Sequence, residues 1–460
     1  MPRPPRLLSL SYRFPPETYP LAMRVKYVLE HLSETWDVDA LTAAHPAAAD
    51  GVRVHHVPPR EPVRLLKWLR RLRLQKLIDL FVWPDSFLFW IVPALLRART
   101  LVRTRRPDAL VTFAMPYSTA IGGVLLKKWT GLPLLLNLND SPTCSDMTPS
   151  HPTRLHAWAA EALEDWFVRN ADAVIYVSRR NMERVRARQP AEQRHKFHLI
   201  RRGVRPLPPP PPTEDVPEPL FRIVYVGGFS GWHHGTDASS PSLLKRLYDR
   251  WQAWGRHVTT SLDYQTHSPL FVGRAVQAVL DAHPEWAGRI QVDVYGPLPP
   301  ENTVQRVLQE HGLENIVHPH GPVPHDQALR TMQTADLLFM TLPDRPDGTP
   351  GGRISAKTYE YLMTDRPILA ALPPGENREY LADKPGVFRV SPTDEDAMAD
   401  VISTLATRAF AGAPLSVDRT ALRPRLNSTA RAQAFASVLR PLVEQQVGST
   451  PTAETSLVDA

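Results

Sequence analysis

Asp347-Gly-Thr-Pro-Gly-Gly-Arg-Ile-Ser-Ala-Lys-Thr-Tyr-Glu-Tyr-Leu362 is the stretch that says most about both the fold and the site. A glycine loop leads into a helix that we expect to begin near Ser355. The unpaired N–H groups and the dipole at a helix N-terminus favour an anion. Arg353 and Lys357 add cations to the first turn, where they are unfavourable to the helix itself. The pattern predicts a bound anion such as a phosphate; the alternative is a Lys357–Glu360 surface pair worth about 0.2–0.5 kcal/mol.

Strands and helices alternate on both sides of this stretch. Helical periodicity, as at 21–32 and 303–311, separates short apolar runs that read as buried strands. This alternation predicts parallel sheets with helices on both faces, and so an α/β fold with two doubly wound, Rossmann-like domains. The expected strands are 6–12, 38–41, 52–57, 108–113, 134–138, 173–177 and 198–200 in the first half, and 221–226, 289–295, 316–320, 336–340 and 367–371 in the second.

A proline-rich segment separates the two series of strands. Five consecutive prolines at 208–212 favour a stiff polyproline II spacer, although a surface loop inside one domain is the alternative. The predicted organisation is an N-terminal domain, a linker, a C-terminal domain with one insertion, a terminal helix and a flexible tail. The corresponding ranges are 1–205, 206–220, 221–427 with the insertion 229–267, 428–447 and 448–460.

Composition and charge narrow the class of protein. The chain has 460 residues and 43% hydrophobic residues, which is enough for sizeable cores and excludes global disorder. Its net charge of +7 is unevenly distributed, because residues 1–200 hold 29 Lys and Arg against 18 Asp and Glu, a net of +11, and the remainder is at −4. A basic first domain points to an acidic acceptor or a membrane surface rather than to nucleic acid.

Several features argue against disulfides, metals and a membrane span. Cys144 is the single cysteine and has no His or Cys partners at zinc-site spacing. Trp232, His233 and His234 are expected to pack in a loop rather than to bind a metal. The most apolar stretch, 87–96, spans about ten residues, whereas a transmembrane helix needs about 20. We therefore expect a cytoplasmic protein, peripheral at the inner face of a membrane.

The membrane expectation rests on residues 64–78. Apolar residues there recur at helical spacing and six cations occupy the other positions, with Trp68 at the border. Such a helix can lie on an anionic membrane surface, at about 1 kcal/mol per cation. The alternative is an amphipathic helix packed on its own domain with a solvated basic face.

The ends of predicted strands supply the other candidate residues. Gly227-Gly228, Gly296 and Gly321 follow strands of the second domain, where glycine lets a ligand approach the backbone. Ordinary turn chemistry is the alternative for each, and no G-x-G-x-x-G is present. Asp140 ends a strand of the first domain and is either an acceptor-side or catalytic residue, or an Asx-turn or N-cap.

The order of motifs resembles the glycosyltransferase family 4 enzymes of the GT-B fold. The segment 352–370 resembles their donor-binding helix, and Asn170-Ala-Asp-Ala-Val-Ile-Tyr-Val-Ser178 resembles a strand of their first domain. Ile200-Arg-Arg-Gly-Val204 is similar to the element before their linker. The resemblance covers about residues 6–445.

This resemblance implies two Rossmann-like domains facing a central cleft, with a nucleotide-sugar donor as substrate, retention at the anomeric carbon, and neither metal nor cofactor. Glu360 matches the second Glu of the Glu-x7-Glu motif and would bind the ribose hydroxyls. Ser355 and Ala356 would offer N–H groups to the diphosphate. Gly227 and Gly228 would lie under the phosphates, beside Gly296 and Gly321.

Two positions depart from the family pattern. Gly352 stands where the first Glu of the motif is usual, so its contact to the donor sugar is lost. The Arg-x5-Lys phosphate pair is not visible after Gly228, where the insertion 229–267 begins. We expect Arg353 and Lys357 to replace that pair, and assign them with Asp140 to the catalytic set.

The sequence therefore predicts a glycosyltransferase that acts on a glycan or lipid-linked acceptor in cell-surface polysaccharide or glycolipid synthesis. The departures keep a second reading open, a degenerate non-catalytic GT-B protein that serves as a nucleotide-binding or scaffold subunit. A nucleotide-sugar epimerase on the same fold lacks an evident carboxylate and His catalytic set.

Overall fold

The computed structural model describes residues 3–17, 20–45, 49–144, 146–210, 220–233 and 243–449. The chain forms two compact units. Unit 1 comprises residues 1–144, 152–203 and 428–460, and unit 2 comprises 145–151 and 204–427. Two segments thus lie outside the predicted linear order. The short segment 145–151 belongs to unit 2, and the C-terminal helix returns to unit 1.

Unit 1 is built on a seven-stranded sheet in the order β3-β2-β1-β4-β5-β7-β8, with every pair parallel. All residues of β4, β5 and β7 are buried, as is typical of a parallel sheet covered on both faces. The order reverses between β1 and β4, which makes this point the topological switch of the sheet. The strands are β1 (Arg6–Ser11), β2 (Asp37–Thr42), β3 (Val52–His56), β4 (Ala109–Ala114), β5 (Leu134–Leu138), β7 (Ala173–Tyr176) and β8 (Phe197–Leu199).

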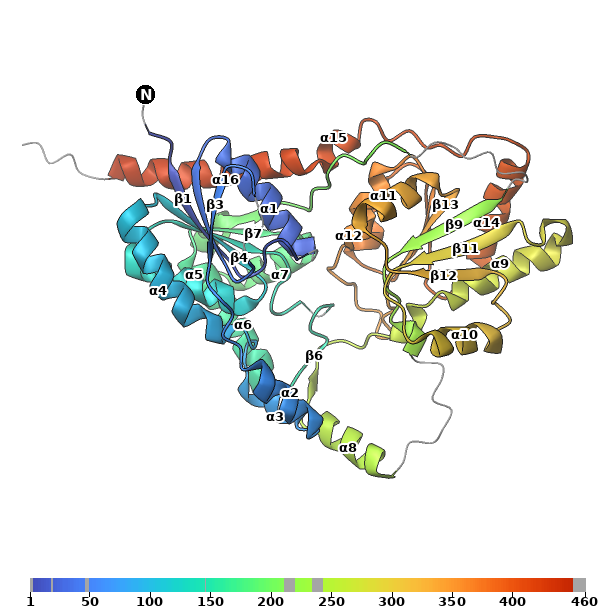
Figure 1. The fold of residues 1–460 in the computed structure, drawn as a ribbon, viewed down its shortest axis with the longest axis horizontal. Coiled ribbons are helices and arrows are strands. Elements are labelled where there is room, and N and C mark those ends of the chain that lie inside the picture. Colours follow the sequence, from blue (N-terminus) through green and yellow to red (C-terminus); the bar gives the residue numbers. More distant parts are fainter. Residues whose placement is uncertain are drawn as a thin grey trace, which may run out of the picture. The chain divides into compact units, whose positions relative to one another are not determined.

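Helices cover both faces of this sheet (Figure 1). One face carries α1 (Pro20–Ser33) and the returning α16 (Ser428–Ser449), and Phe435 of α16 stacks on Phe113 with ring centroids 5.7 Å apart. The other face carries α4 (Leu88–Arg105), α5 (Tyr117–Thr130), α6 (Arg154–Asn170) and α7 (Arg179–Arg188), with the 3₁₀ helix η1 (Ala191–Lys196) before β8.

The prediction of a single amphipathic helix at 64–78 is wrong in one respect. The segment forms two helices, α2 (Val63–Arg71) and α3 (Gln75–Phe81). Arg73 adopts φ +58°, and the N–H groups of Arg73 and Leu74 donate to the carbonyls of Arg70 and Leu69. This is the Schellman ending of a helix, with an arginine where glycine is usual. The chain therefore turns after α2.

Unit 2 is built on a six-stranded parallel sheet in the order β12-β11-β9-β13-β14-β15. Numbered from β9, this is the 3-2-1-4-5-6 order of a Rossmann domain, with its switch point between β9 and β13. The predicted α/β class with two doubly wound units is confirmed. The strands are β9 (Phe221–Val226), β11 (Ile290–Tyr295), β12 (Val317–Gly321), β13 (Leu337–Thr341), β14 (Ile368–Ala371) and β15 (Val387–Val390).

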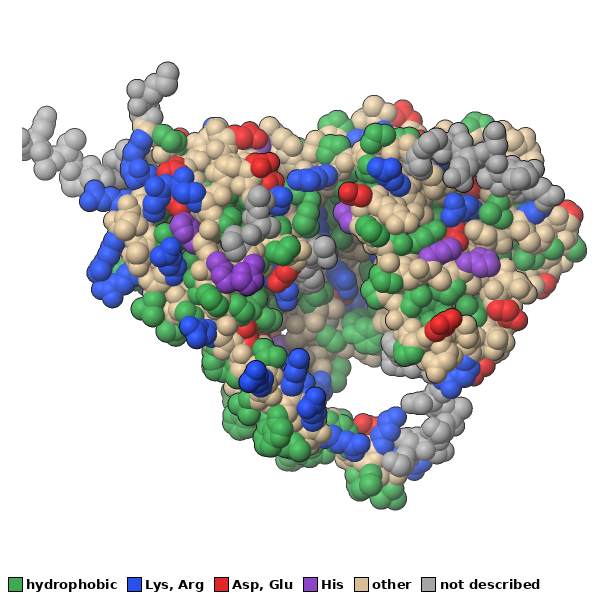
Figure 2. Space-filling view, in the orientation of Figure 1, with side chains coloured by type: hydrophobic (Ala, Val, Ile, Leu, Met, Phe, Trp, Pro, Cys, Tyr) green, Lys and Arg blue, Asp and Glu red, His purple; other side chains and the backbone are tan. Residues whose placement is uncertain are grey.

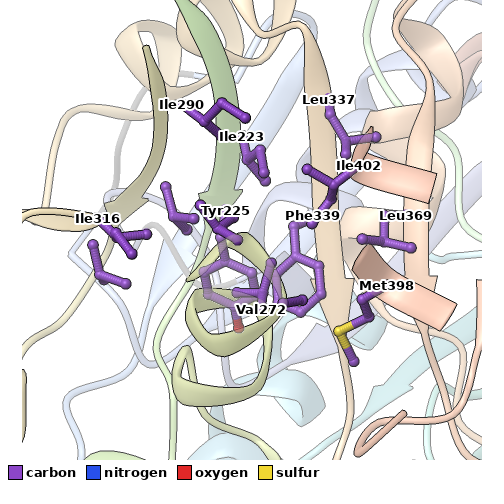
Figure 3. Close-up of a cluster of buried hydrophobic side chains, with 14 of the residues drawn as sticks. Ile223, Tyr225, Val272, Ile290, Ile316, Leu337, Phe339, Leu369, Met398 and Ile402 are labelled. Atoms are coloured by element: carbon purple, nitrogen blue, oxygen red, sulfur yellow. The ribbon is translucent and has the colours of Figure 1, made fainter. Parts of the chain in front are cut away.

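Two hydrophobic clusters hold the helices on this sheet. One cluster joins it to α9 (Leu270–Ala282), η4 (Pro284–Trp286), α10 (Glu301–Glu310) and α14 (Glu395–Phe410). Figure 3 shows part of this cluster, with Tyr225 of β9 and Phe339 of β13 beside Val272 of α9. The opposite cluster joins α11 (His325–Thr334), α12 (Ala356–Met363), α13 (Glu376–Tyr380) and α15 (Arg423–Leu426).

The predicted linker and insertion are described only in part. Residues 211–219 and 234–242, including His234, lie outside the described residues. Just before residue 211, Leu207 packs on unit 2, and the Pro208 carbonyl accepts a hydrogen bond from the side-chain amide of Gln333 at 2.9 Å. The described parts of the insertion form η2 (Gly231–His233), α8 (Leu243–Ala253), β10 (His257–Val258) and η3 (Tyr264–Thr266). Trp232 is buried in the core, as expected of a packed loop.

Candidate functional site

Three of the predicted glycines lie together at the carboxyl edge of the unit 2 sheet. Gly227 follows β9 at φ +137°, and Gly296 follows β11 at φ +155°. A Cβ on Gly296 would lie 2.3 Å from the Gly227 carbonyl oxygen, and the Gly296 N–H donates to the Gly321 carbonyl at 2.9 Å. Glycine is therefore required here because adjacent strand ends approach each other. The same approach leaves the edge without side chains that would block a ligand.

The helix predicted from the glycine loop begins at this edge. Ser355 is the N-cap of α12, is buried, and makes no side-chain cap hydrogen bond to the helix. Ala356 is the first helical residue, so the N-terminus lies where the sequence places it. Tyr361 fixes the helix to the sheet, because its hydroxyl accepts from Val226 N–H at 3.0 Å and donates to the Phe339 carbonyl at 3.1 Å.

Lys357 points from this first turn to the end of β9. Its Nζ lies 2.5 Å from the Tyr225 hydroxyl and 3.8 Å from the centroid of the Tyr225 ring. A Cβ on Gly227 would lie 2.8 Å from the same Nζ. Burial and the nearby Arg353 charge lower the pKa of Lys357 to about 7, while Glu360 opposes the shift. The cation is thus held at the glycine edge and is destabilised until an anion accompanies it.

A hydrogen-bonded chain that the sequence did not reveal orients Tyr225. The Ser230 amide donates to His267 Nδ1 at 3.3 Å, so the imidazole hydrogen belongs on Nε2, which lies 3.1 Å from the Tyr225 hydroxyl. The hydroxyl in turn donates to the Gly228 carbonyl at 3.0 Å. Burial and the charges of Lys357 and Arg353 lower the pKa of His267 to about 3, which keeps the ring neutral.

The insertion therefore contributes to the site. Ser230 and His267 lie at its two ends, and Phe229 stacks on Tyr225 with ring centroids 3.8 Å apart. No motif marks Tyr225 or His267 in the sequence, because their contact joins residues 42 positions apart. The only sequence signal for Tyr225 was its position near the end of a buried strand, directly before Val226-Gly227-Gly228.

A pocket of about 160 Å³ with both polar and apolar lining residues adjoins the same loop, at the carboxyl ends of β13 and β14. Its lining residues include Asp146, Arg345 and Arg353, together with Gly375, Glu376 and Asn377. Arg353, an exposed residue, thus borders the pocket while its charge acts on Lys357. The structure places Arg353, Lys357, Ser355, Ala356 and Glu360 along a single loop and helix that faces Gly227.

Asp140 lies apart from these residues in sequence and belongs to unit 1. It follows β5, and its charge acts together with burial to raise the pKa of Tyr117, the first residue of α5. The Tyr117 hydroxyl donates to the Ser141 carbonyl at 3.2 Å. Asp140 is therefore positioned near the N-terminus of α5, at the carboxyl edge of the unit 1 sheet.

Metal binding and membrane crossing each require a feature that can be recognised in the structure. Within the described ranges, no three His, Cys, Asp or Glu side chains come together as a metal site. No described helix combines the length and apolar character needed to cross a bilayer. Cys144 is buried, and its Sγ accepts a hydrogen bond from the side-chain amide of Asn181 at 3.2 Å.

The groups at the carboxyl edge of the unit 2 sheet suit a ligand that carries several negative charges and an uncharged polar part. Two cations, an uncapped helix N-terminus and glycine-lined strand ends converge at the switch point of a Rossmann sheet, where ligands bind in such folds. The carboxylate of Glu360 lies one helical turn beyond Lys357. The ammonium of Lys357, beside Gly227, can pair with an anionic oxygen at this edge.

Comparisons with known proteins point to one family. The model of the glycosyl transferase 4-like domain matches residues 21–203. No curated protein sequence matches the chain. The solved structure of Anabaena HepE in complex with UDP and glucose is 13% identical, with a TM-score of 0.58, over 95% of this chain and 99% of that chain.

Two synthases are similar in fold to the same extent. Sucrose-phosphate synthase from Thermosynechococcus elongatus is 14% identical, with a TM-score of 0.58, over 97% of this chain and 100% of that chain. The α,α-trehalose 6-phosphate synthase from Burkholderia multivorans is 13% identical, with a TM-score of 0.60, over 97% and 98%. These likenesses establish the fold, and the domain match establishes the family of residues 21–203. Residues 21–203 therefore match a glycosyl transferase 4-like domain, and the chain as a whole shares the GT-B fold of these solved structures.

Proposed function

We propose that the protein transfers a sugar from a nucleoside diphosphate sugar, with a UDP-sugar as the first candidate, to an acceptor hydroxyl. The observation that carries this proposal is the position of Lys357, whose Nζ is held against Tyr225 and directly beside Gly227. HepE was solved with UDP-glucose and with UDP and glucose, which supports uridine as the base to test first.

The donor diphosphate would lie between Lys357 and the N-terminus of α12. Lys357 and Arg353 would neutralise the phosphate charges, and the amides of Ser355 and Ala356 would donate to the phosphate oxygens. Glu360 would accept hydrogen bonds from the ribose hydroxyls. Because the diphosphate gains charge as it departs, these groups would stabilise the transition state more than the bound donor.

The reaction is proposed to retain the configuration of the anomeric carbon and to need no metal ion. The acceptor oxygen forms the new glycosidic bond while the bond from the anomeric carbon to the diphosphate oxygen breaks, and the acceptor's hydroxyl proton passes to the departing diphosphate. Asp140 is assigned to the acceptor side, at the carboxyl edge of the unit 1 sheet. The proposed setting is the synthesis of a cell-surface polysaccharide or glycolipid.

An anionic membrane surface is proposed as the place where the acceptor is met. In α2 and α3, Trp68 is 55% exposed and Phe81 is 81% exposed. Leu65 and Leu72 are also exposed, and five cations, Arg64, Lys67, Arg70, Arg71 and Arg73, are exposed around them. Figure 2 shows hydrophobic and basic side chains intermixed over α2 and α3. Apolar anchors with basic neighbours suit a lipid surface with negative headgroups.

This surface differs in two details from the helix expected at 64–78. Lys76 is buried, so it does not contribute to the basic face. Leu66 is buried in α2 while Leu65 and Trp68 are exposed, so the residues facing out are not those of the expected polar side. Exposed aromatic side chains strengthen the membrane interpretation over a purely solvated basic face.

Gly352 favours a second candidate, a degenerate GT-B protein that binds a nucleotide or a partner without catalysis. A panel of UDP-glucose, UDP-galactose, UDP-N-acetylglucosamine and GDP-mannose separates the two candidates. We expect slow release of the nucleoside diphosphate from one donor, and proton NMR of a transfer product with the donor's anomeric configuration. Absence of both turnover and thermal stabilisation with every donor would favour the scaffold.

A further inference from the structure

The apolar run at 87–96, which is too short to cross a bilayer, supplies the first half of α4. Every position of the helix from 88 to 96 is apolar. One side of this half, which includes Trp90, is buried against the sheet. The opposite side is not, because Val92 is 66% exposed and Leu96 is 62% exposed. A helix that covers a sheet with one face usually has a polar outer face, so the apolar outer face of α4 indicates a contact with something apolar.

This outer face forms one wall of a groove of about 250 Å³, and α5 forms the other. The two helices lie side by side on the unit 1 sheet (Figure 1). Gly122 of α5 permits their close approach, because a Cβ there would lie 3.3 Å from the Cδ1 atom of Ile91 in α4. Six apolar side chains and Arg99 line the groove, among them Leu125 and Trp129 of α5.

The groove has an apolar end and a basic end. Its apolar end lies along the first half of α4. At the other end, toward the C-termini of both helices, the guanidinium of Arg99 lies 5.9 Å from the centroid of the Trp129 ring. Arg103, one turn beyond Arg99, and Lys128 of α5 are also exposed. Neither helix contains an acidic residue. An alkyl chain with an anionic head group matches this order of groups.

We propose that the groove binds one acyl chain of an anionic phospholipid, with the lipid phosphate against Arg99. The exposed apolar residues Phe81, Leu88 and Phe89 connect α3 to Val92 along the sequence. The inference thus extends the membrane surface proposed for α2 and α3 to a defined lipid site, and it rests on that part of the proposed function for the source of the lipid. A groove that takes up a single chain distinguishes lipids by chain length and head-group charge.

A second copy of the chain suits the groove less well. In a two-fold symmetric dimer built on this face, α4 and α5 would meet the same helices of the other copy. Because Arg99, Arg103 and Lys128 are exposed and neither helix has an acid, like charges would face each other. A phospholipid instead brings the complementary negative charge together with the apolar chain.

Octyl phosphate is a soluble probe for this site, since it has one alkyl chain and an anionic head. Calorimetry compares it with butyl phosphate, whose chain is half as long, and with 1-octanol, which lacks the charge. The variants are Leu96→Ser and Arg99→Gln, both at exposed positions where folding should be little affected. Leu155→Ser on α6 is the matched control, because Leu155 is an exposed leucine of the same unit that does not line the groove.

We expect the wild type to bind octyl phosphate at least about tenfold more tightly than butyl phosphate, since each buried methylene adds to the affinity. Leu96→Ser and Arg99→Gln should each weaken octyl phosphate binding about fivefold or more, and Arg99→Gln should leave 1-octanol binding within about twofold. Leu155→Ser should match the wild type for every probe. Equal binding of octyl phosphate by the wild type and both groove variants would place the probe elsewhere and overturn the inference. Equal losses for octyl phosphate and 1-octanol in Arg99→Gln would overturn the phosphate contact.

Vesicles of phosphatidylcholine and phosphatidylglycerol test the source of the lipid. Leu96→Ser should lower co-sedimentation further when it is added to Trp68→Ser with Phe81→Ser. Vesicle binding that Leu96→Ser does not change in either background would overturn the assignment to a bilayer lipid. Self-association of the wild type that Leu96→Ser abolishes would give the groove to a second copy and overturn the inference. Leu96→Ser should bind the nucleotide-sugar as the wild type does, so absence of donor binding in both would refute sugar transfer and leave the lipid site standing.

Discussion

Units 1 and 2 are built on the same strand order around the switch point, yet they present different chemistry. The carboxyl edge of unit 2 brings glycines, Lys357 and Arg353 beside a pocket of about 160 Å³. Unit 1 exposes apolar and basic side chains on α2 and α3, and in unit 2 exposed side chains of this kind occur on α8 of the insertion, away from the glycine edge. The net charges differ in the same sense, +11 over residues 1–200 and −4 over the rest. One topology therefore carries different groups in the two units, and loops and short helices supply those groups.

The largest effect is expected from closing the glycine edge of unit 2. Gly296→Ala introduces a Cβ 2.3 Å from the Gly227 carbonyl at φ +155°, so strand ends must separate. We expect a loss of roughly 2–4 kcal/mol in the free energy of unfolding of unit 2, with unit 1 little changed. Calorimetric unfolding of the full chain resolves this.

Gly288→Ala is the matched control for that substitution. Gly288 also has positive φ, +75°, but nothing lies within 4 Å of an added Cβ. Its loss should be about 1–2 kcal/mol, the cost of the left-handed conformation alone. Equal losses for the two substitutions would show that the strand ends of unit 2 are not as closely packed as described.

The second prediction concerns the pH dependence of donor binding. It distinguishes a specific contact with Lys357 in unit 2 from a general electrostatic attraction between the protein and the donor. Lys357, with a pKa of about 7, is protonated below that pH and neutral above it. Two of the groups around Lys357 stay neutral between pH 6 and 9, because His267 has a pKa of about 3 and the pKa of Tyr225 is raised. Arg353 and Glu360 are its charged neighbours. Donor affinity should be flat below about pH 6.5 and fall up to tenfold per unit above pH 7.

A nucleotide-sugar is the ligand for this titration, because its phosphates are esterified and keep their charge over the range. Lys357→Met should bind weakly at every pH and show no such slope. A wild type whose affinity does not change between pH 6 and 9 would remove the Lys357 ammonium from the phosphate contact.

The smallest effect is expected at the proposed membrane surface of unit 1, on α2 and α3. Trp68→Ser combined with Phe81→Ser removes two exposed aromatic anchors from α2 and α3. Co-sedimentation with vesicles of phosphatidylcholine and phosphatidylglycerol should fall several-fold, and added salt should weaken the wild type through its exposed cations. If co-sedimentation of the wild type does not depend on the fraction of anionic lipid, the proposal that α2 and α3 bind a membrane surface is contradicted.

Much of this fold could be predicted because it depends on local patterns. Buried strands such as β4 and β9 appear as apolar runs, and the glycine loop before Ser355 marks the start of α12 where the structure has it. The end of α2 escaped prediction because Arg73 takes a conformation that the sequence would assign to glycine. An exposed arginine gives no sign that it will adopt positive φ.

The parts of the site that escaped prediction depend on long-range contacts. Tyr225 meets His267 across the insertion, and Asp146 reaches Gly352 from 206 residues away. Tertiary packing, not a motif, brings these groups together.

Titration calorimetry of donor binding at pH 6 tests the central claim most directly. The wild type, Lys357→Met and the control Lys384→Met are titrated with the nucleotide-sugar that the wild type binds best. Loss of a charge-assisted contact of about 1.5–3 kcal/mol predicts that Lys357→Met binds roughly 10- to 100-fold more weakly. Lys384→Met should match the wild type. Equal affinity of Lys357→Met and the wild type would contradict the placement of the diphosphate at Gly227 and Lys357.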